Sequence, residues 1–219
     1  MVLSKMKNMM KAPKRRNLIA FTQPDSKISE QYRSIWANLK YIKRGAGSHR
    51  ILITSPSMNQ GKSTTAANLA VTMSLQKERV LLIDGNLRSP SLHYIFKLPN
   101  TRGLTDILNG AMTFEETIYP SKIGKLDILT SGSVLENPVE LIESEQMDSL
   151  LKMAESQYDM IIMDSPSILD ITETKLLANK CDGVIIVVKN SKTNTEAALT
   201  ARIALERVNA NIVGLVINS

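Results

Sequence analysis

Short runs of apolar residues, rich in valine and isoleucine, alternate along this chain with longer stretches whose apolar positions recur every three or four residues. Runs of the first kind are typical of strands buried on both faces, and stretches of the second kind are typical of helices. The predicted strands cover residues 50–54, 79–84, 126–130, 157–164, 183–188 and 212–217. Helical spacing is found after residues 29 and 61, and near 145–156, 172–180 and 194–208. The alternation predicts the α/β class, with a mainly parallel sheet flanked by helices on both faces in three layers, α/β/α.

The region before the first of these strands holds an arm and two further predicted elements. Residues 1–16 carry six lysines and arginines and no acid, and we predict a basic, disordered arm. Residues 17–22 favour a short strand. A helix follows, with apolar residues at positions 28, 32, 35, 39 and 42, and segment 45–48 closes it. Because 219 residues that are 43% hydrophobic can bury one substantial core, we predict a single domain over 17–219.

The junction between the strand at 50–54 and the helix after it carries Gly61-Lys62-Ser63-Thr64. A residue without Cβ lets the main chain approach phosphate oxygens, and the following helix directs its positive N-terminus at the same anion. Lys62 is expected to neutralise the β- and γ-phosphates of ATP or ADP, and Ser63 to complete the ligand shell of Mg²⁺. We therefore predict a phosphate-binding P-loop here, since the strand and helix on either side make an ordinary turn with a surface lysine the weaker interpretation.

The loop before this motif departs from the usual pattern. Pro56 stands where the first glycine is usually found, and Met58-Asn59 precede Gln60 and Gly61. Asn59, Gln60 and Thr64 complete the predicted nucleotide-binding loop. Asparagine tolerates left-handed backbone dihedrals better than most residues, so the loop is expected to keep its shape at some cost in strain.

Two of the predicted strands end on a carboxylate. Asp84 follows the apolar run at 79–84, and Asp164 ends the run at 157–164. The carboxyl ends of parallel strands are where α/β sheets bind ligands. Asp84 and Asp164 are therefore candidate Mg²⁺ ligands and catalytic residues beside the nucleotide, and the alternative for each is an aspartate that caps a helix or turn.

Charge and cysteine content limit the remaining function classes. The chain has 27 basic and 21 acidic residues, and the six cations of the arm account for the whole excess. A neutral domain argues against a nucleic-acid-binding surface, whereas the arm leaves open a contact with anionic lipid or an acidic partner. No secretory signal and no apolar run long enough to span a membrane are found in the sequence. A single cysteine, Cys181, excludes an intramolecular disulfide and suits a reducing cytoplasm.

The order of motifs resembles the bacterial tyrosine kinases of capsule and exopolysaccharide systems, the CpsD/CapB family within the deviant-Walker P-loop ATPases. The likeness runs from about residue 17 to 219, and its most family-specific part is the Ser-Gly segment followed by Asn-Pro-x-Glu-Leu. The residues that carry it are Gly61-Lys62-Ser63-Thr64-Thr65, Leu82-Ile83-Asp84-Gly85-Asn86-Leu87-Arg88-Ser89-Pro90, Ser131-Gly132, Asn137-Pro138-Val139-Glu140-Leu141-Ile142 and Ile162-Met163-Asp164-Ser165-Pro166.

The resemblance implies a kinase that transfers the γ-phosphoryl group of ATP to protein tyrosine and regulates polysaccharide synthesis and export. Lys62 and Ser63 correspond to the Walker A motif, Asp84 to Walker A′ and Asp164 to Walker B, and Asn218 lies near the position that borders the adenine. Asp84 is a candidate acceptor for the tyrosine proton. The resemblance also implies a membrane-embedded chain-length regulator as activating partner, and hence a cytoplasmic protein at the inner face of the membrane.

Several residues depart from the family pattern. Asn86 replaces the second aspartate of Walker A′, which removes a negative charge from the metal end of the site, and Asn59 strains the loop, so weakened activity is expected. Glu30 and Arg33 match an element used for ring assembly, but Trp36 replaces its last arginine, which weakens the predicted homo-oligomer.

The five tyrosines lie at positions 32, 41, 94, 119 and 158. None follows the last predicted strand, where the family carries its autophosphorylated cluster. Two alternatives to an active kinase therefore stay open: a weakly active or inactive ATP-binding scaffold of the same system, and a positioning ATPase like ParA or MinD. The last expects a signature lysine four residues before Gly61, where this chain has Ser57.

Overall fold

A single seven-stranded sheet forms the middle of the molecule in the computed structural model, which describes residues 18–42, 49–190 and 192–218. The strand order is β3-β4-β2-β5-β1-β6-β7, and all neighbours are parallel except β3 and β4. The strands are β1 (His49–Thr54), β2 (Val80–Asp84), β3 (Ile118–Pro120), β4 (Leu126–Leu129), β5 (Met160–Asp164), β6 (Gly183–Lys189) and β7 (Ile212–Asn218). The predicted arm at 1–16 and the closing segment at 45–48 lie outside the described residues.

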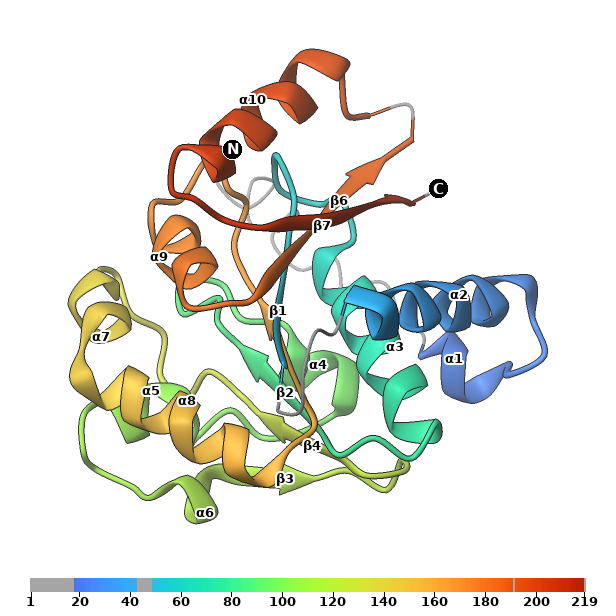
Figure 1. The fold of residues 1–219 in the computed structure, drawn as a ribbon. Helices are drawn as coiled ribbons and strands as arrows, with labels where there is room; N and C mark the ends of the chain where they lie inside the picture. Colours follow the sequence, from blue (N-terminus) through green and yellow to red (C-terminus); the bar gives the residue numbers. More distant parts are fainter. Residues whose placement is uncertain (1–17, 43–48, 191, 219) are drawn as a thin grey trace, which may run out of the picture.

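Helices cover both faces of this sheet (Figure 1). α1 (Ile19–Thr22), α2 (Lys27–Ile42), α3 (Lys62–Leu75) and α4 (Leu92–Phe96) lie on one side. On the other side lie α5 (Leu104–Leu108), α7 (Val139–Glu143), α8 (Glu145–Gln157), α9 (Glu173–Asn179) and α10 (Thr195–Glu206), with α6 (Phe114–Thr117) beside α5. Two buried clusters fill the spaces between the layers. The predicted three-layer, mainly parallel fold is confirmed.

The three central strands are apolar because they are covered on both faces. Every residue of β2 and β5 is buried, and so are the last four residues of β1. Successive side chains of one strand point to opposite faces, so Leu52 of β1 joins one cluster while Ile51 and Ile53 join the other. Continuous apolar runs, without polar alternation, are the expected result.

The prediction of a strand at 17–22 is wrong, because residues 19–22 form the short helix α1. The N–H groups of Phe21 and Thr22 donate to the carbonyl of Leu18, at 3.0 and 2.9 Å, which closes a helical turn. Asn68 of α3 fixes this turn from outside, since its Oδ1 accepts a hydrogen bond of 2.9 Å from the N–H of Ala20. A contact with a residue 48 positions away thus overrides the local preference for an extended chain.

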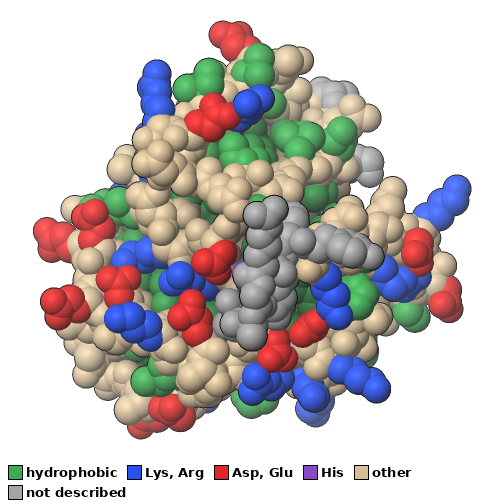
Figure 2. All heavy atoms as spheres, in the orientation of Figure 1, with side chains coloured by type: hydrophobic (Ala, Val, Ile, Leu, Met, Phe, Trp, Pro, Cys, Tyr) green, Lys and Arg blue, Asp and Glu red, His purple; other side chains and the backbone are tan. Residues whose placement is uncertain are grey.

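Charged side chains of both signs are mixed over most of the face seen in Figure 2, and the few Lys and Arg side chains along its lower edge lie close to acidic ones. Nucleic-acid surfaces gather lysine and arginine into a patch, and the described part of this face shows no such patch. In the described ranges, no helix is long and apolar enough to cross a lipid bilayer.

Candidate active site

The loop between β1 and α3 has the backbone shape that its sequence requires. Asn59 and Gly61 both have positive φ, at 62° and 93°, so the left-handed conformation expected of Asn59 is present. Hydrogen bonds inside the loop hold this shape, since Ser55 Oγ donates to the Ser57 carbonyl at 2.6 Å and Gln60 Nε2 donates to Ser57 Oγ at 2.7 Å. These bonds come from residues of the loop itself, so the loop contributes to its own conformation.

The loop after β5 is hydrogen-bonded to the segment where β1 enters the P-loop. The N–H of Ile168 donates to the carbonyl of Ser55 at 2.9 Å, and Thr54 Oγ1 donates to the carbonyl of Pro166 at 2.9 Å. These bonds join residues more than a hundred positions apart in the sequence. They tie the P-loop to the segment that begins with Asp164.

Lys62, Ser63 and Thr64 form the first turn of α3, which starts directly after Gly61. No side chain caps this helix. The first N–H groups of any α-helix lack acceptors within the helix and carry a partial positive charge, so this end of α3 suits an anion. The Lys62 side chain is only 9% exposed. Its positive charge is therefore weakly screened by water and would interact strongly with a bound anion.

Asp84 and Asp164 lie side by side at the carboxyl ends of adjacent parallel strands. They are register partners of the β2–β5 pair, and both are fully buried. Asp164 is also the register partner of Ile53 on β1, next to the start of the P-loop. The sheet order thus brings both predicted carboxylates to the edge where the P-loop begins.

Asp84 also organises the chain that follows it. One carboxylate oxygen accepts from the N–H groups of Ser91 and Leu92, each at 2.9 Å, and the other accepts from the N–H of Asn86 at 3.2 Å. The capping role considered for this aspartate is therefore present, and these donors occupy acceptor positions of the carboxylate. Asn86 in turn accepts from the N–H of Ser89 at 3.1 Å through its Oδ1.

An ion pair that the sequence did not predict lies beside this loop. Arg88 donates to one oxygen of Glu173, through Nε at 2.8 Å and Nη2 at 2.5 Å. The Glu173 side chain is 3% exposed, so its charge requires this partner. The pair joins the loop after β2 to α9, across the ends of the strands that carry Asp84 and Asp164.

Asn218 reaches the P-loop from the last residue of β7. Its Nδ2 donates to the carbonyl of Gln60 at 3.1 Å. A Cβ added at Gly61 would collide with the same Nδ2, so the two residues are in direct contact. The structure therefore gathers the predicted nucleotide-binding residues 59–64 and Asn218 at one place.

This contact predicts a specific cost for Gly61→Ala. The substitution introduces left-handed strain of about 1–2 kcal/mol and also displaces Asn218 from Gln60, which costs roughly 1 kcal/mol more. Gly110→Ala is the matched control, because Gly110 has a φ of 70° and no atom lies within 4 Å of an added Cβ. Urea unfolding should show the larger loss for Gly61→Ala, and Asn218→Ala in the same chain should remove the excess. Equal losses for the two glycines would show that the Asn218 contact contributes nothing.

The residues present fit a metal ion only together with a ligand. Among the described residues, no group of three or more histidine, cysteine, aspartate or glutamate side chains could hold a metal. Mg²⁺ commonly uses one or two carboxylates and completes its shell with phosphate oxygens and water. Ser63, Asp84 and Asp164 are the residues of this site suited to that arrangement.

A glycine in left-handed conformation before a buried lysine, at the edge of a parallel sheet that carries two aspartates, defines a P-loop nucleotide-binding protein. P-loop ATPases of this fold bind nucleotides, typically with Mg²⁺. The AAA domain family matches residues 53–212. The tyrosine-protein kinase YwqD of Bacillus subtilis (strain 168) is 41% identical over 203 residues, which cover 93% of this chain and 86% of that protein.

Solved structures agree with this match. The chimerical protein CapA2B2 superposes with a TM-score of 0.88 at 36% identity, over 92% of this chain and 88% of that chain. The septum site-determining protein MinD of Pyrococcus horikoshii, complexed with Mg-ADP, gives 0.66 at 23% identity over 78% and 70%, which shows the shared fold alone. The chain belongs to the AAA domain family and, within it, to the bacterial tyrosine kinases of capsule and exopolysaccharide systems.

Proposed function

We propose that this chain binds ATP with Mg²⁺ at the P-loop and transfers the γ-phosphoryl group to tyrosine of a protein substrate. The observation that carries the proposal is the placement of Lys62 and the first turn of α3 at the same sheet edge as Asp84 and Asp164. Phosphoryl transfer depends mainly on positioning and on cationic and backbone donors aimed at the phosphates. The identity of 41% to a tyrosine-protein kinase supports the same reaction.

Each residue has a role in this proposal. The N–H groups of 59–64 bind phosphate oxygens, and Lys62 neutralises the β- and γ-phosphates. Ser63 and Asp164 would hold Mg²⁺, which would supply charge neutralisation at the transferred group. Asp84 fixes the loop that follows β2, completes the metal site and is the candidate acceptor for the tyrosine proton. Asn218 positions Gln60 and borders the adenine.

The partner is a membrane-embedded regulator of polysaccharide chain length, whose cytoplasmic tail activates the kinase. This partner holds the protein at the inner face of the cell membrane. Self-association through Glu30 and Arg33 requires a change of partners, because in this structure Arg33 donates to Glu30 Oε2 through Nε at 2.8 Å and to the carbonyl of Pro24 at 2.8 Å. Nucleic acid is not a partner in this proposal.

The second candidate is an ATP-binding scaffold with little transfer. Asn86 favours it, because its backbone N–H donates to Asp84 at 3.2 Å while its side chain is an uncharged amide where the family carries a second aspartate. A positioning ATPase ranks below both, since Ser57 stands in place of the signature lysine. The Ser57 hydroxyl accepts a hydrogen bond from Gln60 within the loop.

One experiment separates kinase from scaffold. The full chain is incubated with Mg-ATP and with synthetic cytoplasmic tails of candidate regulators, and phosphotyrosine and ADP are measured separately. The kinase predicts phosphotyrosine in proportion to ADP. Binding of ATP with neither product, for every tail tested, would contradict the proposed activity and support the scaffold.

Asn86→Asp is predicted to raise the rate of phosphoryl transfer at least tenfold. It restores a unit charge beside the metal end of the site, and tenfold corresponds to about 1.4 kcal/mol of transition-state stabilisation. A carboxylate oxygen can accept the Ser89 N–H as the amide oxygen does, so the loop should keep its shape. Single-turnover assays with an activating tail and a tyrosine acceptor make the measurement. Equal rates for parent and variant would show that the missing charge does not limit transfer.

A further inference from the structure

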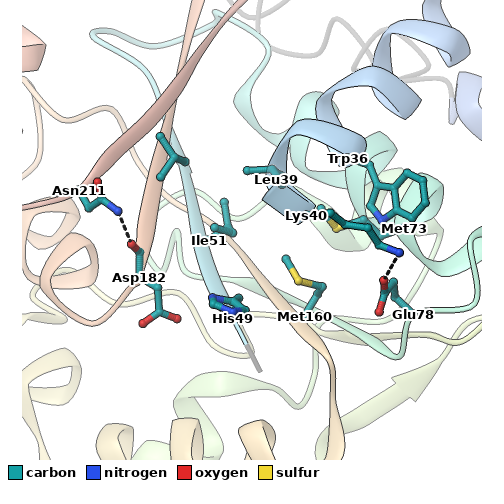
Figure 3. A pocket seen from close by; sticks show the side chains of 11 residues that line it. Trp36, Leu39, Lys40, His49, Ile51, Met73, Glu78, Met160, Asp182 and Asn211 are labelled. Atoms are coloured by element: carbon teal, nitrogen blue, oxygen red, sulfur yellow. Dashed lines mark hydrogen bonds and ion pairs between the residues drawn. The ribbon is translucent and has the colours of Figure 1, made fainter. Parts of the chain in front are cut away.

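A cavity lies at the opposite end of β1 from the P-loop. It has a volume of about 250 Å³ and is bounded by α2, by the end of α3 and by the first residues of β1, β5 and β7. Figure 3 shows Trp36, Lys40 and Glu78 on one side and Asp182 with Asn211 on the other. Ile51, Leu39 and Met160 lie between them. No residue of this cavity belongs to the proposed nucleotide site.

The cavity is lined mainly by apolar side chains, and contacts within the fold position two of its walls. Lys40 lies over the ring of Trp36, with Nζ 4.4 Å from the centroid, and the same nitrogen pairs with Glu78 at 3.3 Å. These contacts hold one wall in place. The facing wall includes Val213, which the strand register skips at an irregularity where β6 meets β7. The Val213 side chain lies close to Gly183, because a Cβ at Gly183 would be 2.8 Å from Cγ1 of Val213. Glycine at 183 thus lets Val213 line the cavity.

The polar groups of the cavity lie apart from its apolar middle. The Lys40–Glu78 pair lies on one side, and the imidazole of His49 lies at the first residue of β1. His49 is partly exposed and lines the cavity. A polar group of a ligand can therefore meet His49 while its apolar part contacts Ile51, Leu39 and Met160.

We propose that this cavity is a second ligand site, which takes a small, flat, mainly apolar molecule with one hydrogen-bonding group. An apolar cavity of about 150 Å³ is large enough for benzene, so about 250 Å³ accommodates a fused bicyclic ring. Ligand pockets are typically apolar with few polar groups, as this one is. His49 and Ile51 belong to β1 and Met73 to α3, the two elements that hold the P-loop between them, so the ligand contacts the supports of the nucleotide site.

Indole is the probe for a direct test, and the chain provides its own reporters. It has one tryptophan, Trp36 in the cavity, and two histidines, His49 in the cavity and His93 on α4. Titration of the full chain with indole should shift the NMR signals of the Trp36 ring N–H and of His49 along one saturable curve, and leave His93 unchanged. Equal, unsaturable shifts of both histidines would overturn the proposal.

Two variants locate the binding. Met160→Trp fills the cavity from its floor and should weaken indole binding at least tenfold, as followed by the His49 signal. His49→Ala should weaken binding with the cavity otherwise intact, whereas the matched His93→Ala should not. If Met160→Trp fails to fold, the histidine pair decides, and equal affinities in that pair would overturn the proposal. These readouts need no nucleotide or kinase activity, so failure here is distinct from failure of the proposed function.

Discussion

Lys62→Met is expected to lower the affinity for ADP with Mg²⁺ by more than tenfold, or about 1.4 kcal/mol. Methionine is one atom shorter than lysine but keeps an unbranched, apolar stem, so the buried side chain still packs at the start of α3. What the variant loses is the one positive charge directly after Gly61. Isothermal titration calorimetry with ADP and Mg²⁺ measures the difference.

Lys152→Met is the matched control, because Lys152 is exposed on α8, on the other face of the sheet. It removes the same charge from the chain and should leave the affinity unchanged. A Lys62 variant that binds ADP as tightly as this control would show that the P-loop is not the nucleotide site.

Asp164→Asn is expected to reduce Mg²⁺-dependent turnover on the order of a hundredfold, while ADP affinity changes by only a few fold. The amide is nearly isosteric with the carboxylate, but it lacks the charge that holds the metal against the transferred phosphoryl group. Measuring phosphotyrosine formation and ADP binding on the same preparation separates the two effects.

The control for this variant lies at the other end of the same strand. Asp159, one residue before β5, pairs with Arg79 at 2.7 Å and is far along the strand from Asp164. Asp159→Asn should lower the free energy of unfolding, because it removes this ion pair, and should leave the turnover rate of the folded protein unchanged. Full turnover in the Asp164 variant would leave that residue with a purely structural role.

The sequence was sufficient for the parts of the fold that depend on local pattern. The strands that became β1, β2, β5 and β6 are continuous apolar runs, and such runs are read without knowledge of their neighbours. The two aspartates could be placed at one sheet edge because parallel strands present their carboxyl ends together. The order of strands then made Asp84 and Asp164 register partners.

The rest depends on contacts between distant residues. α1 is helical where its composition favours a strand, because Asn68 holds the N–H of Ala20. β3 has three residues and ends in proline, which is too short for a periodic signal. The Arg88–Glu173 pair joins residues 85 positions apart, and the cavity beside α2 draws on six separate parts of the chain, so no local pattern reveals either.

The central position of β1 has a consequence for the order in which the protein is made. Its two neighbours are β5 and β6, which begin at Met160 and Gly183. During synthesis the P-loop leaves the ribosome long before either neighbour exists, and its hydrogen bonds with Ile168 and Pro166 form equally late. Contacts between such distant segments form slowly because a long loop must first close. A nascent chain therefore carries its phosphate-binding motif unformed until most of the domain has been translated.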